Sequence, residues 1–192
     1  VWALMAGPAR AQTTTRVSLD SGGNEANLPS GAIFFNALSF SMSSDGRFIA
    51  LESDATNLVP NDTNAFTDIF IHDTLTAQTI RVSVDSNGVQ ANGPSHEPSI
   101  SDDGRYVAFA SDASNLFAPD VYGHRDVFVH DLQTGQTRCA SLDAGGYVGS
   151  GPSHLPSISA NGRWVAFVSL ASNLWSGDAN NRFDVLLRDM QT

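Results

Sequence analysis

The chain has 192 residues, of which 41% are hydrophobic and only 16% are charged, and its formal net charge is −10. This excess of carboxylates argues against a nucleic-acid or anionic-membrane partner, which would need clustered Lys and Arg, and it permits cations or basic proteins. The length allows a sizeable core, and no apolar run approaches the about 20 residues of a transmembrane helix, so we expect no transmembrane segment.

The first segment, VWALMAGPARAQ, is an apolar run that ends in small residues. Ala9-Arg10-Ala11 fits an A-x-A-like cleavage site. Residues 1–11 therefore look like the remnant of a bacterial secretory signal peptide and predict a periplasmic or secreted protein. The alternative is a disordered or locally packed N-terminus. The missing initiator Met and an end inside a repeat also predict that the chain is a piece of a longer protein.

The next segment, residues 15–20, predicts a single strand, because Arg16–Leu19 (RVSL) aligns with Arg81–Val84 (RVSV) further along the chain. The connection that follows is seven residues longer than its later counterpart, and its centre, Ile33-Phe34-Phe35, is apolar. This insertion either folds back onto its own repeat or anchors a partner at the surface.

From residue 40 onward the sequence states the same pattern three times, with a period of 58 residues. The period is set by three Asp/Asn-Gly-Arg triplets, at residues 45–47, 103–105 and 161–163. A fixed period of this length indicates units that bury their faces by stacking on one another. We place the repeat cores at residues 40–84, 98–142 and 156–192.

Each repeat contains four short strand patterns joined by turn signals. In the second repeat they lie at residues 99–101, 106–110, 127–129 and 137–142, and Asp103-Gly104 is a hairpin signal because glycine accepts a positive φ. The second pattern is apolar at consecutive positions, as expected for a strand covered on both faces. The sequence therefore predicts an all-β fold. It is a β-propeller of four-stranded antiparallel blades, of which residues 12–192 form a partial arc of about three.

The run S-x-S-x-D-G-R-x-x-A-F, followed by D-[VI]-F-[VI]-x-D, resembles the TolB-type, WD-repeat-like propeller repeat of bacterial envelope proteins. The resemblance extends over residues 15–192. The family's usual Ser-Pro-Asp-Gly stands here as Ser-Ser-Asp-Gly, Ser-Asp-Asp-Gly and Ser-Ala-Asn-Gly, and there is no room for the α/β domain that precedes the TolB propeller. We therefore expect a relative rather than TolB itself. The resemblance implies a fold and no particular activity, since propellers host unrelated functions.

The two ends of this arc are incomplete in opposite ways. The strand at residues 15–20 precedes any first strand of its own, and the last repeat stops after its third. In a complete propeller an N-terminal outer strand commonly completes the last blade. We therefore expect Arg16–Leu19 to be loosely held in this chain, and the edge at Val185–Leu187 to be open.

The connection between the second and third strands carries oxygen ligands at alternate positions, which suits a hard cation such as Ca²⁺. An EF-hand loop has an oxygen ligand at its fifth position and a glycine at its sixth, and a helix follows it. Counted from Asp62, these positions are Phe66 and Thr67, and a strand pattern follows, which argues against an EF-hand. The other interpretation, which we prefer, is that Asp and Asn bond their own backbone to shape the turn. Calcium is the one cofactor that this pattern allows. The candidate ligands are Asp62, Asn64 and Asp68 in the first repeat and Asp178, Asn180 and Asp184 in the third.

Two histidines precede the inner strand of successive repeats, in Pro94-Ser95-His96-Glu97-Pro98 and Pro152-Ser153-His154-Leu155-Pro156. Because that strand lines the central channel of a propeller, His96 and His154 are candidate channel-facing ligands for a metal or an anion. The alternative is a packing or capping role, which the first repeat favours because it has Leu38 at this position.

The remaining titratable residues show no catalytic set. Cys139 is the single cysteine, so no internal disulfide forms, and we interpret it as a spectator thiol. We expect His72 and His130 to lie at strand ends and to face solvent. The common metal, nucleotide and hydrolase motifs are absent, and each recurring carboxylate appears once per repeat, which indicates architecture rather than catalysis.

The preferred function is an exported, non-enzymatic binding or scaffold module that presents its loop face to a protein or glycan in the cell envelope or outside the cell. The alternative is the propeller part of an enzyme. That enzyme would be a glycan lyase or hydrolase, or a peptidase whose catalytic domain lies beyond Thr192.

Overall fold

The computed structural model describes residues 13–31, 39–118 and 120–191. All regular structure in these ranges is β-strand. The signal-peptide remnant and the apolar centre of the insertion lie outside the described residues. The strands are β1 (Phe40–Met42), β2 (Phe48–Ser53), β3 (Asp68–Asp73), β4 (Gln78–Arg81), β5 (Ser95–Ile100), β6 (Tyr106–Ser111), β7 (Asp126–Asp131), β8 (Gln136–Cys139), β9 (Ser153–Ile158), β10 (Trp164–Ser169) and β11 (Asp184–Asp189).

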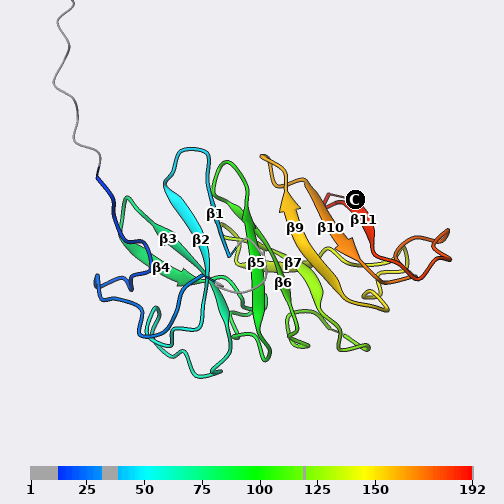
Figure 1. Cartoon of the computed structure of the whole chain (residues 1–192), viewed down its shortest axis with the longest axis horizontal. Helices are drawn as coiled ribbons and strands as arrows, with labels where there is room; N and C mark the ends of the chain where they lie inside the picture. Colours follow the sequence, from blue (N-terminus) through cyan, green and yellow to red (C-terminus); the bar gives the residue numbers. More distant parts are fainter. Residues whose placement is uncertain (1–12, 32–38, 119, 192) are drawn as a thin grey trace, which may run out of the picture.

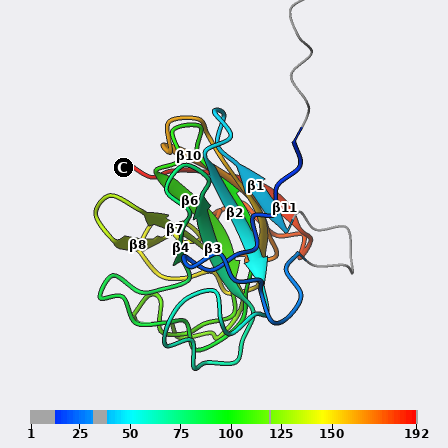
Figure 2. The same ribbon diagram turned by 90° about the vertical axis from the view of Figure 1, so that its left-hand side faces the viewer.

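The strands form three antiparallel sheets, one for each sequence repeat (Figure 1). Blade 1 has the order β1-β2-β3-β4, blade 2 has β5-β6-β7-β8, and blade 3 has β9-β10-β11. The first strands β1, β5 and β9 lie beside one another, whereas β4 and β8 lie at the opposite side of the stack (Figure 2). Stacked four-stranded sheets with their first strands together are propeller blades, so the predicted fold class is confirmed.

The two ends of the blades carry different connections. Short hairpin turns lie at one end, at the top of Figure 1. The long loops between the second and third strands, together with the connections from one blade to the next, lie at the other end. We call this second end the loop face.

The hairpin end is held by a latch that recurs in every blade. In blade 1, Gly46 takes a φ of 73°, which allows the tight turn that an L side chain would strain. Arg47 then donates from Nε and Nη2 to the two carboxylate oxygens of Asp73, at 3.0 and 2.8 Å. This bidentate pair lowers the pKa of Asp73. Arg105 pairs with Asp131 and Arg163 with Asp189 in the same way.

An aromatic ring of each blade covers the turn glycine of the next. The ring of Phe48 lies over Gly104 so closely that an added Cβ would be 2.2 Å from its Cδ2 atom, and Tyr106 covers Gly162 at 2.0 Å. A side chain at either glycine would therefore displace the ring. This aromatic-on-glycine contact joins neighbouring blades near their hairpin ends.

The core lies between the sheets, and both faces of β6, the second strand of the middle blade, are covered. Phe109 of β6 is fully buried, and its ring centroid lies 5.8 Å from that of Phe128. Phe167 of β10 is buried at the equivalent place. Side chains of blades 1 and 2 form one apolar cluster and side chains of blades 2 and 3 form another, so each blade is stabilised through its neighbours.

The inner strands begin earlier than the sequence predicted. The prediction started the second repeat's first strand at Ser99, whereas β5 starts at Ser95. Its register against β6 shifts between His96 and Ser99, because Glu97 takes a left-handed φ of 60° and stays out of the ladder as in a β-bulge. β9 has the same irregularity, with Leu155 at a φ of 52°.

The predicted strand at residues 15–20 differs from the structure. Residues 13–18 form no strand, and Leu19 makes only an isolated bridge to Glu25. β4 and β8 are strands because β3 and β7 lie beside them. Within the described residues, no strand lies beside residues 13–16 to pair with them.

The prediction that His72 and His130 face solvent is wrong, because both are buried under the chain segment that leads into their blade, near Leu19 for His72 and near Val84 for His130. The hydroxyl of Thr79 donates to the carbonyl of Leu19, so it accepts a hydrogen bond from Nδ1–H of His72 at 2.9 Å. Thr137 makes the same bridge to His130, at 2.8 Å. Burial lowers the pKa of both imidazoles, and both side chains are structural.

Candidate functional site

The blades are alike at their hairpin ends and differ where the inner strands meet the loop face. Six polar side chains lie there, and we call them the inner-strand cluster. Three of them, Glu52, Glu97 and Arg125, are not repeated in the other blades. They come from the end of β2, the start of β5 and β9, and the loop between β6 and β7. The cluster consists of Glu52, His96, Glu97, Asp112, Arg125 and His154.

Glu52 and His96 bring blades 1 and 2 together at this place. Oε1 of the buried Glu52 carboxylate lies 3.1 Å from Nδ1 of His96, and Oε2 accepts the backbone N–H of Glu97 at 3.2 Å. The N–H of Glu97 is free to point at this carboxylate because the bulge removes it from the β5–β6 ladder. The predicted histidine site is therefore bonded to the preceding blade in blade 2.

Glu97 makes the equivalent contact between blades 2 and 3. Its carboxylate accepts the backbone N–H of Leu155, the residue at the bulge of β9. Leu155 carries no carboxylate and is exposed, so the series of caps ends there within the described residues. Glu97 and Leu155 occupy the same position in the repeat. This position therefore holds a capping carboxylate in blade 2 and an exposed apolar side chain in blade 3.

Arg125 and Asp112 close the outer side of the cluster. Nε and Nη2 of Arg125 donate to the two oxygens of Asp112 at 2.9 and 2.6 Å. Burial lowers the pKa of His154; Glu97 opposes this shift, and Arg125 adds to it. The ring of Phe183 meets His154 edge-on, at a centroid distance of 6.1 Å. His154 is therefore a neutral imidazole at pH 7, beside an exposed aromatic ring.

In the first Asp/Asn loop, the guanidinium of Arg81 lies beside the two candidate carboxylate ligands. Nη2 of Arg81 lies 3.0 Å from Asp62 Oδ1, and its Nε lies 3.5 Å from Asp68 Oδ2. Asn64 donates to Asp68 and to the carbonyl of Ala91, both at 3.0 Å. Desolvation raises the pKa of Asp68, and its hydrogen bond from Ser83 and the charge of Arg81 counteract that shift.

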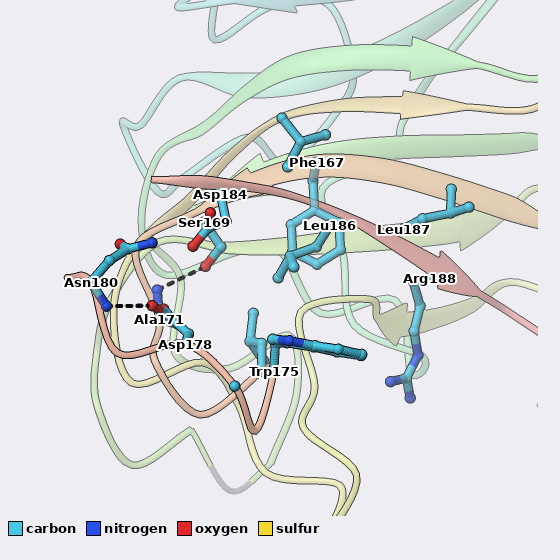
Figure 3. Close-up of a pocket in the computed structure, with 13 residues that line it drawn as sticks. Phe167, Ser169, Ala171, Trp175, Asp178, Asn180, Asp184, Leu186, Leu187 and Arg188 are labelled. Atoms are coloured by element: carbon cyan, nitrogen blue, oxygen red, sulfur yellow. Dashed lines mark hydrogen bonds between the residues drawn. The ribbon is translucent and has the colours of Figure 1, made fainter. Parts of the chain in front are cut away.

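The corresponding loop of blade 3 lines a cavity of about 520 Å³ beside β11 (Figure 3). Asp178 accepts the N–H of Asn180 at 3.1 Å, and Asn180 accepts that of Arg182 at 2.6 Å, as a turn-shaping role requires. Asp184 lies opposite Ser169 at the start of β11. Across residues 13–31, 39–118 and 120–191, no three His, Cys, Asp or Glu residues are arranged to hold a metal ion. Calcium binding stays a prediction.

Blade 2 has lost the cation at this position. Cys139 stands where blade 1 has Arg81, and burial raises the pKa of its thiol to about 12. Asp126, the equivalent of Asp68, keeps a hydrogen bond from Ser141 at 2.6 Å but has no arginine. Burial raises its pKa to about 7.

The raised pKa of Asp126 predicts a pH-dependent stability. Because its folded pKa of about 7 exceeds the ordinary value of 3.8, the folded state binds the proton more tightly. The stabilisation is complete below about pH 4 and is lost as the pH rises to about 7. Asp126→Asn, which cannot ionise, is expected to remove this loss and to raise the free energy of unfolding at pH 8 by roughly 2 kcal/mol.

Urea unfolding of the wild type and of Asp126→Asn at pH 5 and pH 8 measures this effect. The histidines titrate in both proteins, so their contribution cancels when the free energies of the two proteins are subtracted. The exposed Asp102→Asn is the matched control and should change little. Parallel pH profiles for wild type and Asp126→Asn would contradict the assignment.

The sequence interpretation found His96 and His154 but missed Glu52, Glu97 and Arg125. The available signal was the loss of repetition at the 58-residue offset, where Glu52 corresponds to Ala110 and Val168. The sequence alone does not show that residues of different blades meet at one place.

No protein-family model and no curated protein matches the chain. The β-propeller domain of the Trilobed protease from Pyrococcus furiosus matches at 14% identity with a TM-score of 0.50, over 88% of this chain and 42% of that one. A structure of prolyl endopeptidases has the same identity and TM-score, over 92% and 23%. The putative TolB from Agrobacterium tumefaciens matches at 17% identity with a TM-score of 0.48, over 83% and 47%.

The chain spans less than half the length of each of these structures. At these identities the likeness shows the β-propeller fold alone, and the closer relationship to the TolB-type family stays a prediction. None of the described residues belongs to a helix that is long and apolar enough to cross a membrane.

Proposed function

We propose that this chain is an exported, non-enzymatic propeller module that binds a protein or glycan through the inner-strand cluster on its loop face. The observation that carries this proposal is the position of Glu52, Glu97 and Arg125, which the other blades do not repeat. They lie near one another at the loop-face end of the inner strands, while the latch at the opposite end repeats in all three blades. A scaffold needs the repeated latch, whereas a selective surface needs the residues that differ.

The charges of the cluster favour a basic segment of a partner protein. Glu52, Glu97 and Asp112 supply three carboxylates against the one guanidinium of Arg125, on a chain with a net charge of −10. Such a surface attracts Lys and Arg side chains at a distance and can bind them through charge-assisted hydrogen bonds. The neutral imidazole of His154 adds a group that can donate and accept. A glycan is the second partner class, because carboxylates and an exposed ring also suit sugar hydroxyls and faces.

The geometry supports binding rather than catalysis. Glu52 and His96 form a carboxylate–imidazole pair, but the nearest strand serines hold each other: Ser95 bonds Ser111 at 2.9 Å. Among the described residues, a nucleophile aligned with this pair is therefore lacking. The alternative, that the chain is the propeller part of a larger enzyme, leaves the role of this surface unchanged.

Export to the periplasm or the cell exterior is part of the proposal. Its support is the signal-like sequence of residues 1–11. Cleavage after Ala11 in a bacterial host, read as the N-terminal sequence of the secreted protein, is the direct test.

A titration with a short labelled peptide of alternating lysine and serine tests the binding surface. Fluorescence anisotropy should show saturable binding, and Glu97→Gln should weaken it about tenfold, since the amide keeps the bond from Leu155 but removes the charge. Asp102→Asn, at the hairpin end, is the charge-matched control and should bind like wild type.

Two outcomes count against the proposal. Equal affinity of Glu97→Gln and wild type would place the binding elsewhere, and turnover of an oligosaccharide or peptide by the purified chain would overturn the non-enzymatic role. Binding of neutral oligosaccharides without the peptide would identify a glycan, rather than a basic segment, as the partner.

A further inference from the structure

A groove of about 440 Å³ lies between blades 1 and 2, and we call it the blade 1–2 groove. Both blades that form it are four-stranded sheets. Its sides come from β4, from the β5–β6 turn and from the turn after β7, so it lies at the hairpin end, on the side of the stack where Figure 2 shows β4 and β8. The lining residues that matter below are Phe48, Ile80, Asp103, Gly104 and Leu132.

The repeat places the same kind of gap between blades 2 and 3, and there the protein covers it with its own arginine. Arg138 of β8 corresponds to Ile80 of β4, and Met190 of blade 3 corresponds to Leu132 of blade 2. Nη1 of Arg138 donates to the backbone carbonyl of Met190. A guanidinium of blade 2 thus extends over the gap to blade 3, where the side chain of Met190 is only 6% exposed.

The blade 1–2 groove has no such arginine. Ile80 is 45% exposed, and its side chain has no donor for the carbonyl of Leu132. Ile80, Phe48 and Leu132 instead give the groove apolar sides. Apolar sides of this kind suit the methylene stem of a long cationic side chain, whose charged end stays at a polar rim.

The acid at the rim changes together with the arginine. Asp103 lines the blade 1–2 groove, whereas the corresponding residue beside the arginine-covered gap is Asn161. Oδ1 of Asp103 accepts the hydroxyl of Ser101 at 2.6 Å and the backbone N–H of Arg105 at 3.0 Å. The gap that contains an arginine therefore has a neutral amide, and the groove without one has a carboxylate.

The other charged residues that line the groove are already paired. Asp73 is bonded to Arg47, and Arg105 is bonded to Asp131. Among the residues that the structure describes, Asp103 pairs with no cation. A cationic ligand is therefore complementary to the charge that remains at the rim of the groove.

We propose that the blade 1–2 groove binds an arginine side chain of a partner protein. The stem of this arginine packs on Ile80 and Leu132. Its guanidinium donates to the carbonyl of Leu132, as Arg138 does to that of Met190, and to the carboxylate of Asp103. Arginine suits the groove better than lysine because a planar guanidinium presents several N–H donors in a fixed fork and can bond a carbonyl and a carboxylate together. This site lies at the opposite end of the blades from the inner-strand cluster.

A peptide with one arginine tests the site. The probe is glycine-serine-arginine-serine-glycine with blocked ends, added to the full 192-residue chain labelled with ¹⁵N. The backbone amides of Gly104, Arg105 and Gln133, which line the groove, should shift and saturate. The same peptide with citrulline keeps the shape of the side chain without its charge, and should bind about tenfold more weakly.

Asp103→Asn gives blade 2 the turn that blade 3 already has. In that turn Asn161 accepts the hydroxyl of Ser159 at 2.8 Å and the N–H of Arg163 at 3.1 Å, so the substitution preserves the hairpin. It should weaken peptide binding about tenfold, because it removes the charge and keeps the shape. Asp45→Asn makes the same change in the blade 1 turn, outside the groove, and should bind like wild type.

Ile80→Arg gives blade 1 the arginine that blade 2 already has. The new guanidinium should reach the carbonyl of Leu132 and prevent the peptide from binding, while circular dichroism checks that the sheet content is unchanged. Ile80→Leu, which keeps an apolar side chain there, is the matched control and should retain binding.

Any of three results would overturn the proposal. The first is the absence of shifts at the groove amides at millimolar peptide. The second is equal affinity for the citrulline peptide, and the third is wild-type affinity of both Asp103→Asn and Ile80→Arg. Because the shifted amides identify where the peptide lies, shifts confined to the inner-strand cluster would contradict this site and leave the binding proposed for that cluster intact.

Discussion

Replacing Phe109 with alanine is expected to lower the free energy of unfolding by about 3 to 5 kcal/mol, as for other fully buried phenylalanines. Phe109 is 0% exposed and packs at 5.8 Å from Phe128, between blades 1 and 2. Because neither face of β6 reaches solvent, the space left by the ring cannot be filled by water or by a small shift of one sheet. Chemical unfolding monitored by circular dichroism measures the loss.

The control for this prediction is Leu75→Ala. Leu75 is a large apolar residue in the turn between β3 and β4, and it is exposed, so its truncation should cost less than about 0.5 kcal/mol. A loss under about 1 kcal/mol for Phe109→Ala would mean that the blades do not form one cooperative core.

Replacing Arg81 with methionine is expected to destabilise the protein by about 3 to 5 kcal/mol at pH 7. The guanidinium is the cation next to Asp62 and Asp68, and methionine would leave both carboxylates buried without a counter-charge. The folded pKa of Asp68, which desolvation already raises, would rise further. The loss should therefore shrink as the pH falls and Asp68 takes up a proton.

Two matched variants separate the buried charge from the lost packing. Arg47→Met breaks the half-exposed latch to Asp73 and should cost much less than Arg81→Met, because solvent screens exposed ion pairs. Arg81→Met combined with Asp62→Asn and Asp68→Asn removes all three charges and should recover most of the stability. If the triple variant is as unstable as Arg81→Met alone, the cause is the loss of packing around the arginine stem.

Blade 2 shows how the fold tolerates the missing arginine. Cys139 replaces it there, and the buried Asp126 responds with a pKa raised to about 7. Blades 1 and 2 thus hold the same carboxylate in two ways, once by pairing and once by a shift toward the neutral acid. The two predictions, for Arg81 and for Asp126, test these two solutions independently.

The repeat, the strand count of each blade and the hairpin turns could be predicted from the sequence because each depends on local chemistry. The Asp-Gly-Arg triplets fix a turn within a few residues, and consecutive apolar positions mark a strand covered on both faces. Phe109 and Phe167 belong to that apolar pattern, and both are buried.

What the sequence did not reveal depends on contacts between blades. β5 starts at Ser95 because a carboxylate of blade 1 receives the N–H of Glu97, and no local pattern announces that partner. His72 is buried because residues near Leu19 dock on β4. The position of Arg81 is a further example, because it follows Asp62 and Asp68 in sequence and folds onto the same carboxylates.

The caps that run from Glu52 to Glu97 and from Glu97 to Leu155 all point the same way along the chain. β5 and β9 each receive their bulge-stabilising group from the blade before them. A ribosome delivers those groups in the required sequence, since N-terminal units emerge and fold first. The blades should consequently fold in order from the N-terminus, because the capping group of each new blade is already in place on the folded blade before it. A circular permutant that begins at blade 2 should fold more slowly than the natural chain.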